Sequence, residues 1–173
     1  MIQAVLIRFA RDRRGVAAVE MSLIASLLCV CTVNAVEVAR YASSARQVSA
    51  ATHAAAQAAF ATCDPVHTPA TTKCPELATT TGAAVASTPL GAAVKLSPLT
   101  EGYYCVSTAG KLTYVSAADS PPADCSSVSQ SGIRPGLYLR VQTTYTHAKL
   151  LGVPTVADTF ANPIQRSAWM RMK

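Results

Sequence analysis

An apolar run of 21 residues, positions 16–36, constrains this chain more than any other feature of its sequence. As a helix that rises about 1.5 Å per residue, the run would span roughly the 30 Å hydrocarbon core of a bilayer. Four arginines lie in the 15 residues before it, and only Arg40 and Arg46 follow soon after it. Because basic residues stay on the cytoplasmic side of a membrane, we expect a single-pass anchor with the C-terminal bulk outside the cytoplasm.

A carboxylate, Glu20, lies one turn inside this run, where a charge is costly unless it reaches the interface or meets a cation. Cleavage between Gly15 and Val16 would give Val16 a charged amino group and make Glu20 the fifth residue of the mature helix. In an assembly of staggered helices, the amino group of one subunit would neutralise Glu20 of a neighbour. If the chain is cut there, cleavage supplies the charge that Glu20 lacks.

The sequence at this point, RRGVAAVEMSLI, resembles the processing site of type IV pilin-like proteins, which have Gly before the cut and Glu five residues after it. It is closer still to TadE-like pseudopilins, or minor pilins, of tight-adherence (Flp-type) pilus systems. These often read R-R-G-x-x-A-V-E followed by an aromatic residue, where this chain has Met21. The C-terminal SAWMRMK, residues 167–173, resembles the A-x-x-M-R end of the same family.

The resemblance implies a function and a set of partners. It implies a prepilin peptidase substrate in the bacterial inner membrane, in contact with membrane lipid. Gly15 and Val16 would form the processing site, and Glu20 would act in assembly. Other pilins and inner-membrane pilus assembly proteins are its implied partners, and the implied role is to build, or assist in building, an adhesion or secretion filament. Whether the product is a structural subunit, a tip adhesin or a priming factor does not follow from the resemblance.

Two other interpretations of the N-terminal segment stay open. In one, Glu20 reaches the interface of an uncleaved anchor and Gly15 merely precedes the helix, so that the protein is a periplasmic or cell-surface binding module outside any filament. In the other, residues 1–35 are a secretory signal, because residues 33–35 fit the small-x-small cleavage rule and the mature protein would start at Val36. The N-terminal residue of the mature protein distinguishes the three.

Helical sequence continues beyond the apolar run, since residues 37–62 are rich in alanine and contain neither Gly nor Pro. One helix is therefore expected over residues 16–62. Its second half places mostly small residues on one stripe, namely Tyr41, Ala45, Val48, Ala51, Ala55, Ala58 and Ala59. This stripe predicts close packing against a sheet or against a neighbouring helix of an assembly.

The remaining residues predict strands and loops. Residues 63–98 are dense in Thr, Pro and Ala and lack periodicity over most of their length, so we expect a loop there. Strands over 102–108 and 111–117 flank a hairpin turn at Ala109-Gly110. Alternation of apolar and polar residues predicts two further strands, over 136–147 and 164–172.

Together these elements predict an α+β fold, in which a long N-terminal helix, first transmembrane and then amphipathic, packs against a small antiparallel sheet with disulfide-stapled loops. The expected organisation is a basic leader (1–15), the anchor helix with its amphipathic extension (16–62) and an extracytoplasmic α+β domain with a Thr/Pro-rich loop (63–173).

Six cysteines form two groups. Two lie in the apolar run and are expected to be small buried hydrophobes, while the other four, Cys63, Cys74, Cys105 and Cys125, lie in polar sequence. An even number in a small domain with a thin core predicts two disulfides and an oxidising compartment. A Cys63–Cys74 bridge would close the start of the Thr/Pro loop and Cys105 could pair with Cys125, but four cysteines allow three pairings.

Charge and motifs argue against several other functions. Four of the 15 basic residues and one of the nine acidic residues precede Val16, so the rest of the chain carries a net +3 that is scattered along it. We therefore expect no nucleic-acid partner. The sequence has no Cys-x-x-Cys, glycine-rich phosphate loop or nucleophile elbow, so neither a metal or cofactor site nor an enzyme is expected.

Overall fold

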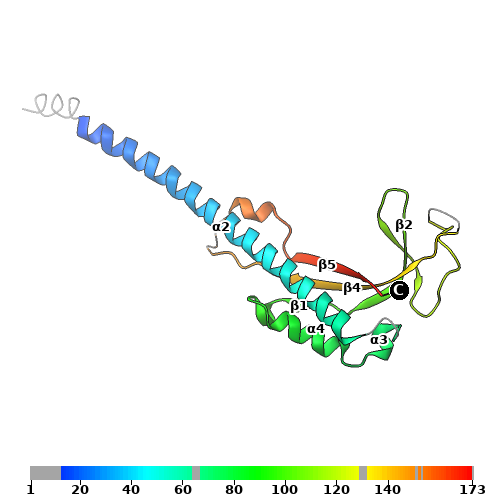
Figure 1. The fold of residues 1–173 in the computed structure, drawn as a ribbon. Helices are drawn as coiled ribbons and strands as arrows, with labels where there is room; N and C mark the ends of the chain where they lie inside the picture. Colours follow the sequence, from blue (N-terminus) through cyan, green and yellow to red (C-terminus); the bar gives the residue numbers. More distant parts are fainter. Residues whose placement is uncertain (1–12, 64–66, 129–131, 151, 153, 173) are drawn as a thin grey trace, which may run out of the picture. The chain divides into compact units, whose positions relative to one another are not determined.

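The computed structural model describes residues 13–63, 67–128, 132–150, 152 and 154–172 (Figure 1). The chain divides into two compact units. The stem unit consists of the chain up to Tyr41 together with Lys149–Phe160, and the sheet unit consists of Ala42–Ala148 and Ala161–Lys173. The leader expected over residues 1–15 lies mostly outside the described residues.

Helix α2, Arg13–Thr62, is continuous through both units and includes the helix expected over residues 16–62. Four uncharged polar side chains of its apolar half donate hydrogen bonds to their own helix. The hydroxyls of Ser22, Ser26 and Thr32 donate to backbone carbonyls three or four residues earlier, and the amide of Asn34 donates to the carbonyl of Val30. The apolar half therefore keeps its helical hydrogen bonding even where its side chains are polar.

In the described part of the chain, five antiparallel strands form one sheet, built around β4, Gly136–Tyr145. Strand β5, Ile164–Arg171, pairs along one edge of β4. On the other edge, β2, Thr100–Val106, pairs with the first half of β4, and the short β1, Lys95–Leu96, pairs near its end. Strand β3, Leu112–Ala117, pairs with β2.

The expected hairpin between β2 and β3 is present. Gly110 has a φ of 74°, which glycine adopts without steric cost, and its backbone N–H donates to the carbonyl of Ser107 at 2.9 Å. The N–H of Ser107 donates in turn to the carbonyl of Lys111 at 2.8 Å. These bonds close the turn, so the position of the hairpin follows from local sequence.

The core lies between the second half of α2 and one face of the sheet. Leu137, Leu139, Val141 and Thr143 alternate along β4 and are at most 1% exposed. The facing stripe of α2 is made of small residues, and its fully buried members are Val48, Ala51, Ala55 and Ala59. Small side chains let the helix backbone approach the strands, and the resulting architecture is the expected α+β fold.

One sequence-based prediction about the fold is wrong. The segment expected as a loop contains helix α3, Ala70–Lys73, helix α4, Leu77–Ala86, the 3₁₀ helix η1, Gly91–Ala93, and β1. In α4, Leu77, Thr81 and Val85 are buried on one face at a spacing of four residues. Because Thr81 is polar, the sequence shows no helical repeat of apolar residues here. Its hydroxyl donates to the carbonyl of Leu77 at 2.7 Å, and the residue can therefore be buried.

Helix α4 lies alongside the second half of α2 (Figure 1). The hydroxyl of Thr62 near the end of α2 lies 3.0 Å from the hydroxyl of Thr80 in α4. Leu77 also belongs to the same buried cluster as Ala59 and Leu137. The two helices therefore share one core with the sheet.

Candidate functional site

The stem unit exposes an apolar helix surface on every side. All described residues of α2 from 15 to 32 are solvent-exposed, including large side chains such as Val16, Leu23 and Leu28, which are about 60% exposed. By length and composition, α2 is the one helix in the described part of the chain that can cross a membrane. Such a surface requires apolar surroundings, and α2 is therefore compatible with a single-pass membrane anchor.

Cys29 and Cys31 lie on this exposed surface. The expectation that both are buried is wrong for the chain itself, because no other element of the described structure covers this part of α2. Their apolar character suits a lipid-facing surface as well as a core.

The predicted processing residues lie inside the helix. Helix α2 begins at Arg13 and continues through Gly15 and Val16, so Gly15 does not interrupt it. A side chain at Gly15 would meet no atom within 4 Å, and Val16 is 61% exposed. Both residues are therefore accessible on the isolated chain.

Glu20 is exposed on the same surface and has no hydrogen-bond or ion-pair partner among the described residues. Its neighbours one turn away along the helix are Val16 and Ile24, both of which are more than half exposed. The carboxylate thus stands in an apolar band without a cation from the described part of its own chain. This arrangement leaves Glu20 available for a partner from outside.

The stem unit also contains a segment, Lys149–Phe160, that we call the strap. It is tied to α2 at the end of the apolar run. The amide oxygen of Asn34 accepts from the backbone N–H of Val156 at 2.9 Å, and Glu37 Oε1 accepts from the N–H of Leu150 at 3.1 Å. Glu37 is 2% exposed and also pairs with Arg40 at 3.3 Å.

Two further contacts order the strap. The ring of Phe160 lies 4.9 Å, centroid to centroid, from the ring of Tyr41. Asp158 accepts from the backbone N–H of Thr155 at 3.0 Å and forms an ion pair with Lys149. Sequence reasoning missed this arrangement, because the partners of Asn34 and Glu37 are 122 and 113 positions away along the chain.

The sheet unit carries its own exposed feature, on the face of the sheet opposite α2. Tyr104 packs edge-on against the rings of Tyr114, Tyr138 and Trp169, with centroid separations of 5.5, 6.0 and 4.8 Å. The guanidinium of Arg140 lies 5.2 Å from the centre of the Trp169 ring, within cation–π distance. Burial raises the pKa of Tyr104, and the nearby charge of Arg140 partly offsets this rise.

Glycines allow two of these rings to lie close to the strands. A Cβ at Gly102 would come within 2.7 Å of the Tyr114 ring, and a Cβ at Gly136 would come within 2.7 Å of the Tyr138 ring. A cleft of about 510 Å³ lies beside Tyr103 of β2. Its lining includes Arg134 and Arg171, together with Tyr103, Pro121, Pro122, Ala123 and Pro135.

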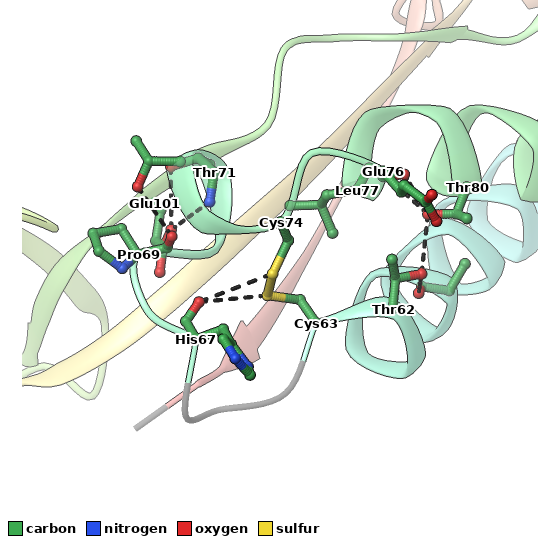
Figure 2. The surroundings of a disulfide bond; sticks show 12 residues. Thr62, Cys63, His67, Pro69, Thr71, Cys74, Glu76, Leu77, Thr80 and Glu101 are labelled. Atoms are coloured by element: carbon green, nitrogen blue, oxygen red, sulfur yellow. Dashed lines mark hydrogen bonds between the residues drawn. A yellow bond between two sulfur atoms is a disulfide. The ribbon is translucent and has the colours of Figure 1, made fainter.

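The four loop cysteines form the bridges Cys63–Cys74 and Cys105–Cys125. In Figure 2, the carbonyl oxygen of His67 points at the first bridge, 3.5 Å from Cys63 Sγ and 3.9 Å from Cys74 Sγ. These are close contacts, because a disulfide sulfur has no proton to donate. Glu101 of β2 fixes the same region, since its Oε2 accepts from the backbone N–H and the hydroxyl of Thr71 at 3.0 and 3.2 Å.

The second bridge holds the loop after β3. The N–H of Cys125 donates to the carbonyl of Ile133 at 2.9 Å. The Asp124 carboxylate accepts backbone N–H groups of Ser126 at 3.1 Å and of Gly132 at 3.4 Å. Hydrogen bonds, first from Ser126 and then from Gly132, lower the pKa of Asp124. This carboxylate therefore organises a loop.

No group of three or more His, Cys, Asp or Glu residues in the described part of the chain could hold a metal ion. His147 Nδ1 lies 3.4 Å from Ser44 Oγ, and its backbone exchanges two hydrogen bonds with the side chain of Asn162. These contacts join the end of β4 to α2 and to the segment before β5.

Comparisons of the chain with protein-family profiles, with curated proteins and with solved structures gave no match.

Proposed function

We propose that this protein is a TadE-like pseudopilin or minor pilin. Prepilin peptidase would cut it between Gly15 and Val16, and α2 would hold it in the bacterial inner membrane with the sheet unit outside the cytoplasm. It would then contribute to the assembly of a tight-adherence pilus that serves as an adhesion or secretion filament. The observation that carries this proposal is Glu20, a carboxylate on an exposed apolar helix with no partner among the described residues.

Cleavage would supply the missing cation. The new amino group of Val16 is positively charged at neutral pH, and a neighbouring subunit shifted along the helix axis would bring that group to Glu20. An ion pair gains strength in an apolar medium, whereas an unpaired carboxylate there is costly. Helices paired in this way would also cover part of each other's exposed apolar surface.

The first test determines where the mature chain begins. We would measure the N-terminal residue and intact mass of the protein from membranes of cells with and without prepilin peptidase. The proposal expects a chain that starts at Val16 only when the peptidase is present. A chain that starts at Met1 would favour an uncleaved anchor, and one that starts at Val36 would favour a secreted protein.

The second test separates assembly from processing. We expect Glu20→Ala to leave cleavage largely intact and to abolish or strongly reduce piliation, because the amino group of the neighbour loses its partner. Glu76→Ala is a matched control, since Glu76 is an exposed carboxylate outside the apolar run. Normal piliation in the Glu20→Ala strain would exclude the role proposed for Glu20.

The aromatic face of the sheet favours a second candidate function, a single-pass periplasmic or cell-surface binding module. Trp169 and Tyr114 are 37% and 55% exposed beside Arg140, a combination suited to a flat ligand that carries negative charge. In that case residues 1–15 stay attached, and the protein extracts from membranes as a monomer. A secreted protein that starts at Val36 would lack Asn34 and, with it, the hydrogen bond that the Asn34 side chain accepts from the backbone N–H of Val156.

A further inference from the structure

Apolar side chains of the strap are exposed beside the end of the membrane helix. Leu150 is 59% exposed and Val156 is 55% exposed, although the backbone N–H of each is bonded to α2. A folded segment usually turns such side chains inward when its backbone is already tied down. Here the backbone bonds hold two large apolar side chains outward.

The points of attachment define the level of the strap along the helix. Asn34 lies two residues before the end of the apolar run and Glu37 lies one residue after it. At about 1.5 Å per residue, both lie within roughly 3 Å of the point where the apolar run ends. If α2 crosses a membrane, the strap therefore lies at the boundary between acyl chains and headgroups.

The charges of the strap suit this position. Its described charged side chains are Lys149 and Asp158, and they form an ion pair with each other. The carboxylate of Glu37, which faces the strap from α2, is buried, accepts the N–H of Leu150 and pairs with Arg40. Neither carboxylate is therefore left without a partner next to the exposed apolar side chains.

We propose that the strap is a second membrane contact, in which Leu150 and Val156 insert into the lipid interface beside α2. The occupant of this surface is lipid, because the exposed side chains of Leu150 and Val156 lie at the level where the exposed apolar run of α2 ends. Amphipathic helices that lie in this interface bury their apolar face about 5–10 Å into the boundary between headgroups and acyl chains, and we expect a similarly shallow depth for these two side chains. This inference rests on the membrane-anchoring part of the proposed function and does not require cleavage or a filament.

The strap would give the anchor a defined depth and orientation. A lone helix can slide along and rotate about its axis within a bilayer. Apolar side chains held to one side of the outer end of the helix favour one insertion depth. They also favour one rotation of the helix about its axis, because only the side that carries the strap is covered. The face of α2 that other subunits can approach would then be restricted.

Tryptophan reporters and brominated lipids test the proposal in the full-length chain. The native Trp169 is changed to Phe, and single tryptophans replace Leu150, Leu28 and, as a water-exposed control in the sheet unit, His53. Each protein is reconstituted into phosphatidylcholine vesicles brominated either close to the headgroup or deep in the acyl chain. Leu150 and Leu28 are both exposed, so neither substitution disturbs a core.

We expect Leu150→Trp to be quenched most by the shallow bromines, Leu28→Trp most by the deep bromines, and His53→Trp by neither. Quenching of Leu28→Trp without quenching of Leu150→Trp would overturn the strap proposal while leaving the anchor intact. A Leu150→Trp reporter with a blue-shifted emission that lipid bromines do not quench would also overturn it, because protein, such as a second copy of the chain, would then cover the strap. Absence of quenching at Leu28→Trp would overturn membrane anchoring itself.

Discussion

A buried pair of hydroxyls joins α2 to the centre of the sheet, and its hydrogen bonds predict unequal effects for two similar substitutions. Thr52 Oγ1 lies 2.7 Å from the carbonyl oxygen of Val48 and is also hydrogen-bonded to Thr143 Oγ1. A carbonyl oxygen only accepts, so Thr52 gives its one proton to Val48 and Thr143 donates to Thr52. Both threonines are buried, with exposures of 2% and 0%.

Replacing Thr52 with Val keeps the shape but leaves the hydroxyl of Thr143 buried without an acceptor. An unsatisfied buried group of this kind costs about 1–3 kcal/mol. Thr143→Val removes the donor instead, while Thr52 keeps its bond to Val48, so the expected loss of stability is below about 1 kcal/mol. The double variant leaves no hydroxyl unsatisfied, and we expect it to be more stable than Thr52→Val alone.

The assay is guanidinium unfolding of the full-length protein in detergent micelles. Trp169, the single tryptophan, reports on the sheet because it lies on β5, which pairs with β4. The unfolding midpoints of the unchanged protein, the two single variants and the double variant together form a double-mutant cycle. Equal costs for the two single substitutions, or a double variant that loses the sum of both, would refute the assigned direction of the hydrogen bonds.

Three further predictions concern other parts of the molecule. Replacing both Cys105 and Cys125 with Ser should lower the free energy of unfolding by about 3 kcal/mol, because the bridge closes a loop of 20 residues; an unchanged guanidinium midpoint would contradict this. The pKa of the Asp158 carboxyl is lowered first by a hydrogen bond from Lys149 and then by one from the backbone N–H of Thr155. The stabilisation of the strap by this carboxylate should therefore be complete above the unfolded pKa of about 3.9. It should be lost as the pH falls through the lower pKa of the folded state. Carbon NMR of that carboxyl should give a midpoint below about 3.9, and a higher midpoint would show that the ion pair does not persist in solution. Gly102→Ala should displace the exposed ring of Tyr114, which would lie 2.7 Å from the new Cβ, and so change the near-ultraviolet circular dichroism but not the far-ultraviolet spectrum; an unchanged near-ultraviolet spectrum would mean that the ring does not rest on this glycine.

Local sequence predicted the elements whose signals are short-range. The alanine-rich segment without Gly or Pro predicted the long helix, Ala109-Gly110 predicted the hairpin, and the alternation along residues 136–147 predicted strand β4. Helix α4 escaped prediction because Thr81 occupies the middle of its buried stripe, and only the hydrogen bond from its hydroxyl back to the helix makes that burial acceptable.

In the candidate site, too, local sequence predicted some residues and not others. Gly15, Val16 and Glu20 could be singled out because their meaning depends on neighbours within one helical turn and on the apolar run around them. The strap could not be predicted, since Asn34 and Val156 are separated by 122 residues and Glu37 and Leu150 by 113. No periodicity or local motif connects positions so far apart.

The sequence by itself therefore determined that this chain has one long apolar helix, an acidic residue one turn inside its apolar run, a small antiparallel sheet and four cysteines in polar sequence. Each of these features follows from periodicity, composition or turn chemistry, which depend on residues that are close together in the sequence. Only the tertiary structure decided which cysteines pair, which aromatic side chains meet across β2, β3, β4 and β5, and which segment lies against the end of the apolar run. Those choices depend on strand register and on hydrogen bonds between distant residues, which exist only once the chain has folded.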